Sequence, residues 1–383
     1  ALGNVGKTVE YIKIKNSLLP DSDSIVRLTK DINDGKVSTL LVLNGNPVYN
    51  APSDLNFADT LKKVKTSIRL GEYFDETAKV CSWHLPCAHF LESWGDARAV
   101  NGSLSVIQPM IAPLFGGKSN IEILNLLVTG EFTSGYEIVR NTWASILPKI
   151  NFEDHWKKVL HDGILENSHS DSEMPSVNAV GFNRIIKEMK APQSIKKDYP
   201  EIVFKVSASV YDGRFANNGW LQELPDPMTK LVWDNAALFS PVLAKEYGLK
   251  NEDVVEIVLR NKKVFLPVWI MPGQADYSVT VLLGYGRKYA GRIGNNVGFD
   301  VYKIRNSTAL NFDSGIKIFK TVKTYPLANT QDHGSMEGRP LVRESSLSEY
   351  RKQPEFAKEM VKHPPLVSLW EEHSYEEGYQ WGM

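Results

Sequence analysis

VSTLLVLNGNP, residues 37–47, is the stretch that decides the fold. Residues 40–43 are continuously apolar, as expected of a strand buried in a parallel sheet. The chain then breaks into NGNP at residues 44–47, a composition typical of a turn. We therefore predict a parallel-sheet lobe from about residue 30 to 130, built on residues 40–43, with NGNP at its carboxyl edge.

Strands and helices alternate after this loop. Ser53 is a suitable N-cap for a helix over DLNFADTLKKV, and residues 68–70 begin a second short strand. KVCSWHLP and SLSVIQP then predict further strands. In SNIEILNLLVTG, Ser119 and Glu122 form a capping box for a helix that ends at Gly130. This alternation predicts an α/β sandwich.

Four regions are expected. The α/β lobe occupies residues 1–135, and 136–200 form a helical connection in three pieces, separated by Pro148 and by the polar loop ENSHSDSEMP. Residues 201–320 read as strands, in EIVFKVSASV, DVVEIVLRN, KKVFLPVWIM and YSVTVLLGYG. Four apolar strands with glycine-rich corners favour a closed β-barrel, because closure removes the edges of a sheet. Residues 321–383 read as an extended tail with one helical stretch, SSLSEYRKQPEFAKEMV.

The tail combines prolines, which interrupt any long helix, with large apolar residues. A free tail seldom keeps so many aromatic residues, because exposing them risks aggregation. We therefore predict a strap that packs partly along this chain's own surface and, from Trp370 onward, docks a further domain or partner subunits. Its prolines are Pro326, Pro340, Pro354, Pro364 and Pro365, and its apolar anchors are Leu366, Val367, Leu369, Trp370, Tyr375, Tyr379 and Trp381.

Composition excludes several classes of protein. Of 383 residues, Lys and Arg number 44 against 45 Asp and Glu, and a net charge of −1 offers no broad surface for nucleic acid. No apolar run approaches the roughly twenty residues that span a bilayer. Two cysteines are too few for a disulfide framework. The abrupt ends lead us to expect a piece of a longer protein, so missing targeting signals carry no conclusion.

ALGNVGKT at the start fits a permissive phosphate-loop pattern. Such a loop works between a buried strand and a helix, and here no strand precedes it. The residues after it, including Val9, Tyr11 and Ile12, alternate with polar ones as in a strand. We therefore expect a turn that leads into a strand.

The densest polar cluster is CSWHLPCAHFLESWGDAR. Cys81, His84, Cys87 and His89 invite a zinc site, yet they crowd into nine residues, whereas structural zinc sites draw two separated ligand pairs. The alternative is that these side chains hydrogen-bond loops at the sheet's carboxyl edge. A cysteine–histidine nucleophile lacks an evident oxyanion donor. A stand-alone hydrolase would need a nucleophile, base and orienter whose proximity the sequence does not show.

From about residue 41 to 383 the chain resembles the molybdopterin oxidoreductase superfamily, segment by segment. LVLNGNPVYNAP is similar to the family's strand and NP loop, and DETAKVCSWHLPCAHFLESWGD and SVIQPMIAPLFGGKSNIEILNLL are similar to the next two segments of the family. LVWDNAALFSPVLAKEYGLKNEDVVEI and LPVWIMPGQADYSVTVLLGYGR resemble its C-terminal barrel. The resemblance implies a parallel-sheet lobe of the formate dehydrogenase/DMSO reductase type, followed by a double-psi β-barrel.

One branch is more similar: the large iron–sulfur subunit of alternative complex III, a membrane-bound quinol-oxidising complex. HLPCAHFLESWGDAR, YDGRFANNGWLQELPDP and PGQADYSVTVLLGYGR carry this likeness, and EEGYQWGM resembles the junction with the branch's iron–sulfur domain. The resemblance implies a place on the periplasmic side of the bacterial inner membrane. The implied partners are the chain's own iron–sulfur domain and the other subunits, with no nucleic acid.

Departures from the family favour a scaffold. Neither Cys81 nor Cys87 inherits a ligand role, and Asn251, Glu252 and Asp253 replace the commoner Gly-Asp turn. Two cysteines cannot hold a four-cysteine cluster, and the family's molybdenum ligand lies upstream of these residues. Our first hypothesis is a cofactor-free scaffold of an electron-transfer oxidoreductase, without catalytic or metal-binding residues of its own. Its iron–sulfur clusters would lie in a further, C-terminal part.

The second hypothesis retains a working cofactor site for molybdopterin guanine dinucleotide. The cofactor's pyrophosphate needs backbone donors and cations, for which Lys118, Arg98 and Arg287 are candidates, although each is equally explained as a solvated or salt-bridged surface residue. The sequence leaves both hypotheses open. The cleft residues that the resemblance implies are Gly45, Asn46, Pro47, Leu85, Pro86, Asn235, Ser240, Pro241, Gly284 and Tyr285.

Overall fold

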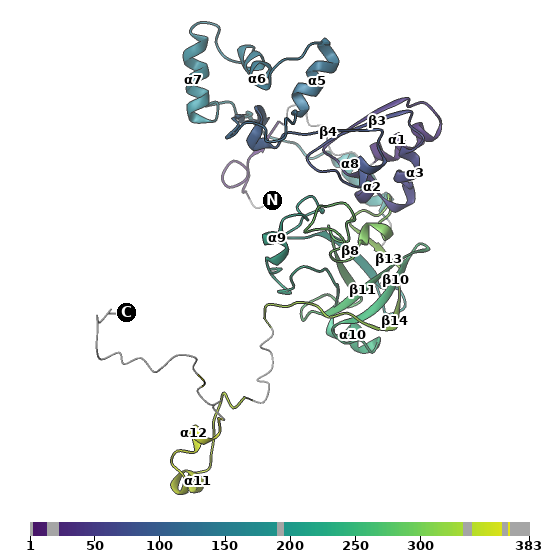
Figure 1. The fold of residues 1–383 in the computed structure, drawn as a ribbon, viewed down its shortest axis with the longest axis vertical. Helices are drawn as coiled ribbons and strands as arrows, with labels where there is room; N and C mark the ends of the chain where they lie inside the picture. Colours follow the sequence, from purple (N-terminus) through teal and green to yellow (C-terminus); the bar gives the residue numbers. More distant parts are fainter. Residues whose placement is uncertain (1–2, 14–22, 190–194, 332–338, 362–366, 368–383) are drawn as a thin grey trace, which may run out of the picture. The chain divides into compact units, whose positions relative to one another are not determined.

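A computed structural model describes residues 3–13, 23–189, 195–331, 339–361 and 367. The chain divides into two compact units, Ala1–Asn329 and Thr330–Met383. The first unit holds a parallel-sheet lobe, a helical cluster and a larger mixed sheet, and the second holds two short helices (Figure 1).

The lobe is built on a three-stranded parallel sheet in the order β2-β3-β4, with β2 at Thr39–Leu43, β3 at Thr66–Gly71 and β4 at Trp83–Pro86. The prediction of a parallel sheet with NGNP at its carboxyl edge is confirmed. Because β2 is an edge strand, its apolar residues are only half-buried, and Leu70 of β3 is fully buried instead. Around the sheet lie α1 (Asp23–Asn33), α2 (Pro47–Asn50), α3 (Phe57–Leu61) and α4 (Glu76–Val80).

One expectation for the lobe is wrong, and a second is confirmed only in part. Ser53 begins only a 3₁₀ turn, η1 (Ser53–Leu55), because Asn56 adopts a left-handed conformation with φ of 45° and α3 starts after it. The strand predicted in SLSVIQP exists as β6 (Leu104–Ile107), but it pairs antiparallel with β5 (Gly95–Arg98) in a separate sheet. The parallel sheet therefore ends at β4.

The helical cluster contains α5 (Asn120–Thr129), α6 (Gly135–Ala144) and α7 (Phe152–Asp162), which lie together in Figure 1. The capping box of Ser119 and Glu122 is confirmed, and Gly130 ends α5 with φ of 75°. The fully buried Trp143 and Trp156 centre the core of this cluster.

The polar loop after α7 is more structured than expected. Its β7 (Ser172–Glu173) pairs antiparallel with β1 (Tyr11–Ile12), and Ser170 is buried. The helix α8 (Ala179–Glu188) comes next, so α6, α7 and α8 are the three helical pieces predicted. Ahead of β1, the Gly6 amide donates to the Val9 carbonyl across a turn, as the sequence indicated.

The mixed sheet has seven strands in the order β13-β8-β12-β9-β11-β10-β14. Two parallel pairs, β8 with β12 and β9 with β11, flank the central antiparallel pair of β12 and β9. The strands are β8 (Glu201–Val206), β9 (Ala237–Phe239), β10 (Asp253–Leu259), β11 (Lys262–Ile270), β12 (Ser278–Leu283), β13 (Phe312–Ser314) and β14 (Lys317–Thr324).

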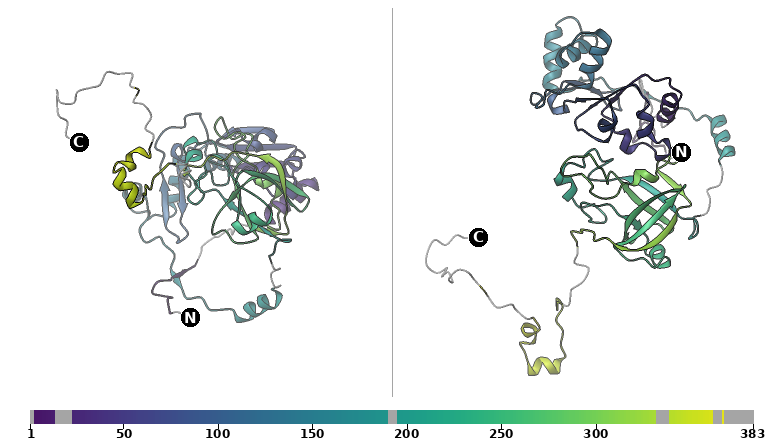
Figure 2. Two further views of the ribbon diagram at one scale, coloured as in Figure 1. Left: turned by 90° about the horizontal axis from the view of Figure 1, so that it is seen from below. Right: turned by 45° about the vertical axis from the view of Figure 1, so that its right-hand side comes forward.

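One core joins the strands of this sheet. Ile202, Phe239 and Ile257, from three different strands, are fully buried in it, and α10 (Pro241–Glu246) and η3 (Val301–Ile304) add further apolar side chains. Figure 2 shows the strands curling around this interior. In the described part of the chain the pairing runs from β13 to β14 without joining these two strands. The closed double-psi barrel therefore stays a prediction.

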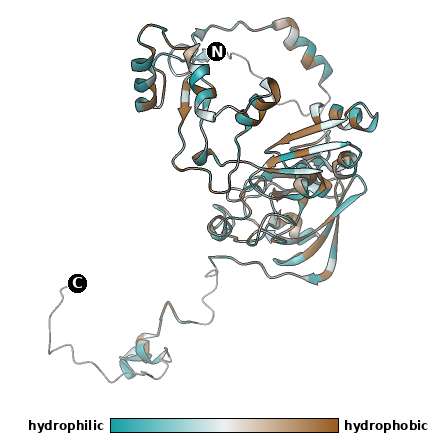
Figure 3. Ribbon diagram, turned by 45° about the horizontal axis from the view of Figure 1, so that its top comes forward, coloured by the Kyte–Doolittle hydropathy of each residue, from teal (hydrophilic) through white to brown (hydrophobic). Residues whose placement is uncertain are grey.

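The tail begins later than expected. The strand β14 extends to Thr324, and Leu327 is buried with Leu231 in a small core beside the mixed sheet. In the second unit Pro354 separates α11 (Leu347–Lys352) from α12 (Phe356–Glu359), so the single helical stretch is two helices, mostly hydrophilic in Figure 3.

The strap is largely untested by the structure. Val367 is described and exposed. The anchors Leu366, Leu369, Trp370, Tyr375, Tyr379 and Trp381 lie outside the described residues. In the described ranges, no helix combines the length and apolar character required to span a bilayer.

Candidate functional site

The segment after β3 places Glu76 where the lobe meets the mixed sheet. Asp75 caps α4 by accepting from the Ala78 amide at 2.8 Å. The same carboxylate accepts from Arg69 Nη2 at 2.8 Å, and both side chains are buried. This pair fixes the first residue of α4, which is Glu76.

Four hydrogen-bond donors converge on the Glu76 carboxylate. Its Oε2 accepts from Asn46 Nδ2 and from Arg287 Nη2, both at 2.8 Å. Its Oε1 accepts from the backbone amides of Lys288 at 2.8 Å and Tyr289 at 3.0 Å. We call these five residues the Glu76 junction, because they join the NGNP loop and α4 to the segment after β12.

The Glu76 carboxylate is held in its charged form. Burial alone would raise its pKa, but the Arg287 guanidinium, the Tyr289 amide and the Asn46 amide outweigh burial and lower the pKa to about 2. The side chains of Arg287 and Glu76 are only 5% and 10% exposed. The positive charge of Arg287 is therefore compensated inside the protein.

Arg287 also contacts the surrounding loops. Its Nη1 donates to the Gly213 carbonyl at 2.8 Å, and its guanidinium lies 5.5 Å from the centre of the Tyr49 ring. The Tyr49 hydroxyl donates to the Tyr285 carbonyl at 2.7 Å. Gly213 has φ of 101°, and a Cβ there would lie 2.9 Å from the Tyr49 ring, so this approach requires glycine.

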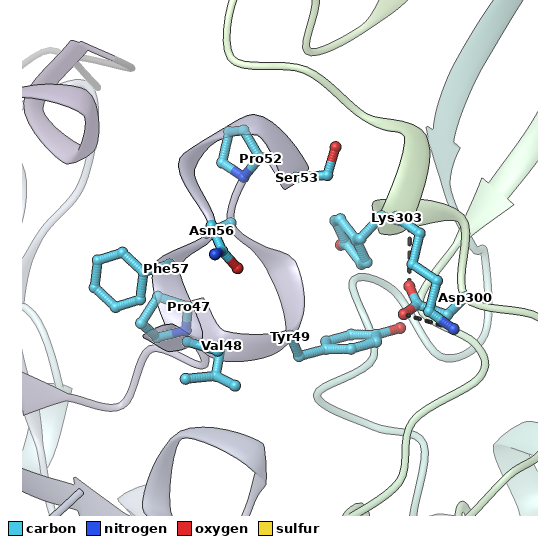
Figure 4. A pocket seen from close by; sticks show the side chains of 12 residues that line it. Pro47, Val48, Tyr49, Pro52, Ser53, Asn56, Phe57, Asp300 and Lys303 are labelled. Carbon is cyan, nitrogen blue, oxygen red and sulfur yellow. Dashed lines mark hydrogen bonds and ion pairs between the residues drawn. The ribbon is translucent and has the colours of Figure 1, made fainter. Parts of the chain in front are cut away.

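A pocket of about 220 Å³ lies beside the junction, with walls from the lobe and from the segment around η3 (Figure 4). Asp300, whose side chain is 14% exposed, is the acid in its wall. One Asp300 oxygen accepts from the Tyr302 amide at 3.1 Å, and Lys303 Nζ lies 3.7 Å from the other. Burial raises the Asp300 pKa to about 6; Lys303 opposes this shift, and the charge of Glu76 adds to it. This carboxyl therefore titrates near neutral pH.

Replacing Asp300 by asparagine is expected to stabilise the protein at pH 7. The pKa of Asp300 is about 6 in the folded state against an ordinary 3.8 in the unfolded chain. Stability is therefore highest below about pH 4, where the carboxyl is neutral in both states. It is lost as pH rises to about 6, because the unfolded chain ionises first. The substitution should recover about 1–3 kcal/mol at pH 7 and little at pH 4. Urea midpoints of the full chain at both pH values measure this. A variant less stable at pH 7 contradicts the burial argument.

The structure brings some of the implied cleft residues together and separates others. Asn46, which lies between Gly45 and Pro47 in the sequence, donates to the Glu76 carboxylate. The carbonyl of Tyr285, which follows Gly284, accepts from the Tyr49 hydroxyl. Asn235 lies near Tyr285, since a Cβ on Gly298 would contact both. Leu85 and Pro86 end β4 at the same carboxyl edge of the parallel sheet as NGNP, two strands away. Ser240 and Pro241 lie apart, since they begin α10, beyond the opposite end of β9 from Asn235.

The polar side chains among these residues are engaged within the chain. Asn46 Oδ1 accepts from the Thr77 amide at 3.2 Å and the Thr77 hydroxyl at 2.7 Å. Asn235 donates to the Leu282 and Phe299 carbonyls at 2.7 and 3.0 Å and accepts from the Phe299 amide at 2.8 Å. Ser240 Oγ accepts from the Leu243 amide at 3.1 Å.

The candidate cations are engaged too. Arg287 pairs with Glu76, Lys118 Nζ lies 4.3 Å from the centre of the Phe132 ring, and Arg98 donates to the Gly102 carbonyl. The pocket beside Asp300 is also smaller than the roughly 300–1,000 Å³ typical of ligand sites. In this arrangement the polar groups and cations that would hold molybdopterin guanine dinucleotide are taken up by contacts within the chain.

Within the cysteine–histidine cluster, His89 has a structural role, whereas His84 Nδ1 is buried without a hydrogen-bond partner among the described residues. The amide of Leu91 donates to His89 Nδ1 at 3.2 Å, and Glu92 accepts from the His89 amide, so His89 caps the 3₁₀ turn η2 (Phe90–Glu92). Burial raises the pKa of the Cys81 and Cys87 thiols and lowers that of His84. Among the residues that the structure describes, no group of three or more potential ligands is placed to hold a metal ion.

The full chain is expected to bind zinc no better than its Cys81→Ser/Cys87→Ser variant. The potential ligands are too compressed in sequence to close a tetrahedron, and His89 is committed to its cap. Zinc titration with a chromophoric chelator, at equal protein concentration, compares the two proteins. Loss of one tightly bound zinc ion in the variant contradicts this prediction.

Comparisons with known proteins add one distant structural likeness. No protein-family model and no curated protein matches the chain. Among solved structures, acetylene hydratase from Pelobacter acetylenicus is similar, with a TM-score of 0.48 and 13% identity over 77% of this chain and 46% of that one. The chain thus spans about half the length of that structure. The chain's own architecture is mixed α/β, with parallel and antiparallel sheets.

Proposed function

We propose that this chain is the molybdopterin oxidoreductase-like segment of an iron–sulfur electron-transfer subunit, and that it is a cofactor-free scaffold. The proposal places it in a respiratory quinol-oxidising complex of the alternative complex III kind, on the periplasmic side of the inner membrane. Its partners there are its own iron–sulfur domain and the other subunits. Several sequence segments resemble this branch in the same order along the chain, which supports the assignment.

The Glu76 junction is the observation that carries the scaffold role. A dinucleotide between the lobe and the mixed sheet would need cations and backbone amides for its phosphates. Here the Glu76 carboxylate of the lobe accepts hydrogen bonds from Arg287 and from two backbone amides of the segment after β12. Direct contact between protein groups thus joins the two parts, which supports a role as a scaffold for an electron-transfer domain.

The second candidate is a working molybdopterin guanine dinucleotide-binding portion of a molybdenum oxidoreductase. It is favoured by the parallel sheet, since open sheets of this kind bind ligands beyond the carboxyl ends of their strands, where NGNP lies. Under this candidate Glu76 would have to leave Arg287 when the cofactor binds.

Isolation of the native complex tests the first candidate. With an affinity tag on the chain in its source cells, we expect membrane-associated subunits to co-purify, together with iron–sulfur signals in electron paramagnetic resonance and quinol-dependent electron transfer. Protease access from the periplasm tests the location. Recovery of an iron-free protein that is active alone contradicts the proposal.

Deletion of residues 366–383 is expected to leave the first unit folded and to weaken assembly of the complex. The apolar anchors of this stretch are the proposed contacts with the iron–sulfur domain or partner subunits, and burying each large side chain is worth roughly 1.5–3 kcal/mol. Native gels and circular dichroism separate assembly from folding. Normal assembly and electron transfer in the truncated protein would leave the tail as a tether only.

A further inference from the structure

The donors around Glu76 have the composition of an anion site. Three of the four come from one short segment, residues 287–289: Arg287 Nη2 and the consecutive backbone amides of Lys288 and Tyr289. Consecutive backbone amides beside a guanidinium bind oxyanions, because several dipoles and a charge point at one position. Asn46 adds the fourth donor from the NGNP loop.

We propose that residues 287–289 form an oxyanion-binding nest and that Glu76 occupies it as an intramolecular carboxylate ligand. The ligand class is a small oxyanion, either a carboxylate or a phosphate. The inference deepens the proposed scaffold role, and rests on it only in taking the docked carboxylate as the group that replaces a bound cofactor between lobe and sheet.

The nest is built by contacts that do not involve Glu76. The Gly286 amide donates to the Val297 carbonyl at 2.7 Å, and the Asn296 amide donates to the Arg287 carbonyl at 2.6 Å. Gly286 has φ of 71°, and a Cβ there would lie 2.2 Å from the Asp300 nitrogen, so this backbone is closely packed. Arg287 is held independently by the Gly213 carbonyl. Removing the Glu76 side chain should therefore leave the donors in place.

The nest has donor capacity that Glu76 does not use. Arg287 Nε is buried and has no hydrogen-bond partner among the described residues. We expect a free oxyanion, which is not tethered to α4, to use this donor as well. A vacated nest should therefore accept a free oxyanion from solution.

Anion rescue of a Glu76→Ala variant tests the proposal on the full chain. We expect this variant to melt at a lower temperature than the natural protein in sodium chloride. Its melting temperature should rise with sodium acetate at constant ionic strength and approach the natural value. Inorganic phosphate is the second probe: rescue by either anion supports the nest, and the comparison shows which oxyanion shape fits.

Two controls make the result specific. Glu72→Ala removes an exposed acid four residues earlier and should show no acetate effect beyond that of the natural protein. The double variant Glu76→Ala/Arg287→Met should lose the rescue, because the charged donor is gone. Failure of both anions to rescue, or equal rescue in the double variant, overturns the proposal.

A second variant keeps the test decisive if Glu76→Ala does not fold. Glu76→Gln fills the nest with a neutral acceptor, so we expect a folded protein, less stable than the natural one and indifferent to acetate. Full stability in Glu76→Gln contradicts docking of a charged ligand. None of these outcomes depends on iron content or complex assembly, so the proposed function stands or falls separately.

Discussion

Replacing Arg287 by methionine is expected to lower the free energy of unfolding by about 3–5 kcal/mol, because it leaves the Glu76 carboxylate buried without its cationic partner. The folded pKa of Glu76 lies near 2 against an ordinary 4.5, so its stabilising contribution is complete above about pH 4.5 and is lost as pH falls toward 2. The difference between natural and variant protein should therefore shrink at pH 3. Urea unfolding of the full chain at pH 7 and pH 3 measures it.

An exposed ion pair provides the matched control. Lys158 Nζ lies 2.6 Å from an Asp162 oxygen on α7, and the two side chains are 57% and 28% exposed. Lys158→Met should change the free energy of unfolding by less than about 1 kcal/mol. Similar losses at Arg287 and Lys158 would mean that the buried junction has no special role in stability.

Replacing Asn235 by alanine is expected to lower the free energy of unfolding by about 2–4 kcal/mol. Asn235 is 1% exposed, and its removal leaves the Leu282 carbonyl and both backbone groups of Phe299 without these partners. Urea unfolding at pH 7 measures the loss.

Asn125→Ala is the control for Asn235, since Asn125 lies part-buried on α5 and donates to the Thr133 hydroxyl. It should change stability by less than about 1 kcal/mol. If Asn235→Ala is as stable as the natural chain, Asn235 is not a structural cross-link, and the second hypothesis, in which it lines a cofactor cleft, gains support.

The parts of the fold that obey local rules were predictable. The apolar run at residues 40–43 with NGNP after it indicated the parallel strand, and the Ser119–Glu122 capping box located the start of α5. Local rules failed at Ser53, where the left-handed Asn56 interrupts the predicted helix. They also failed for the partner of β6, because strand pairing is decided by distant residues.

The candidate site was harder to predict for the same reason. Glu76 and Arg287 are 211 residues apart in the sequence, so no local pattern signals their contact. Arg287 was singled out as a cation for pyrophosphate, but its partner inside the protein was missed. The elevated pKa of Asp300 arises from burial beside η3, which only the assembled fold creates. The available signal was the sequence DET after β3, where acids begin a helix.

The amount of molybdopterin guanine dinucleotide in the purified full-length subunit tests the central claim most directly. Acid hydrolysis followed by chromatography quantifies released guanine nucleotide, and elemental analysis of the same sample gives molybdenum and iron per chain. We expect iron in stoichiometric amounts, with guanine nucleotide and molybdenum far below one equivalent. Stoichiometric molybdenum and guanine nucleotide would contradict the cofactor-free scaffold and establish the cofactor-binding alternative.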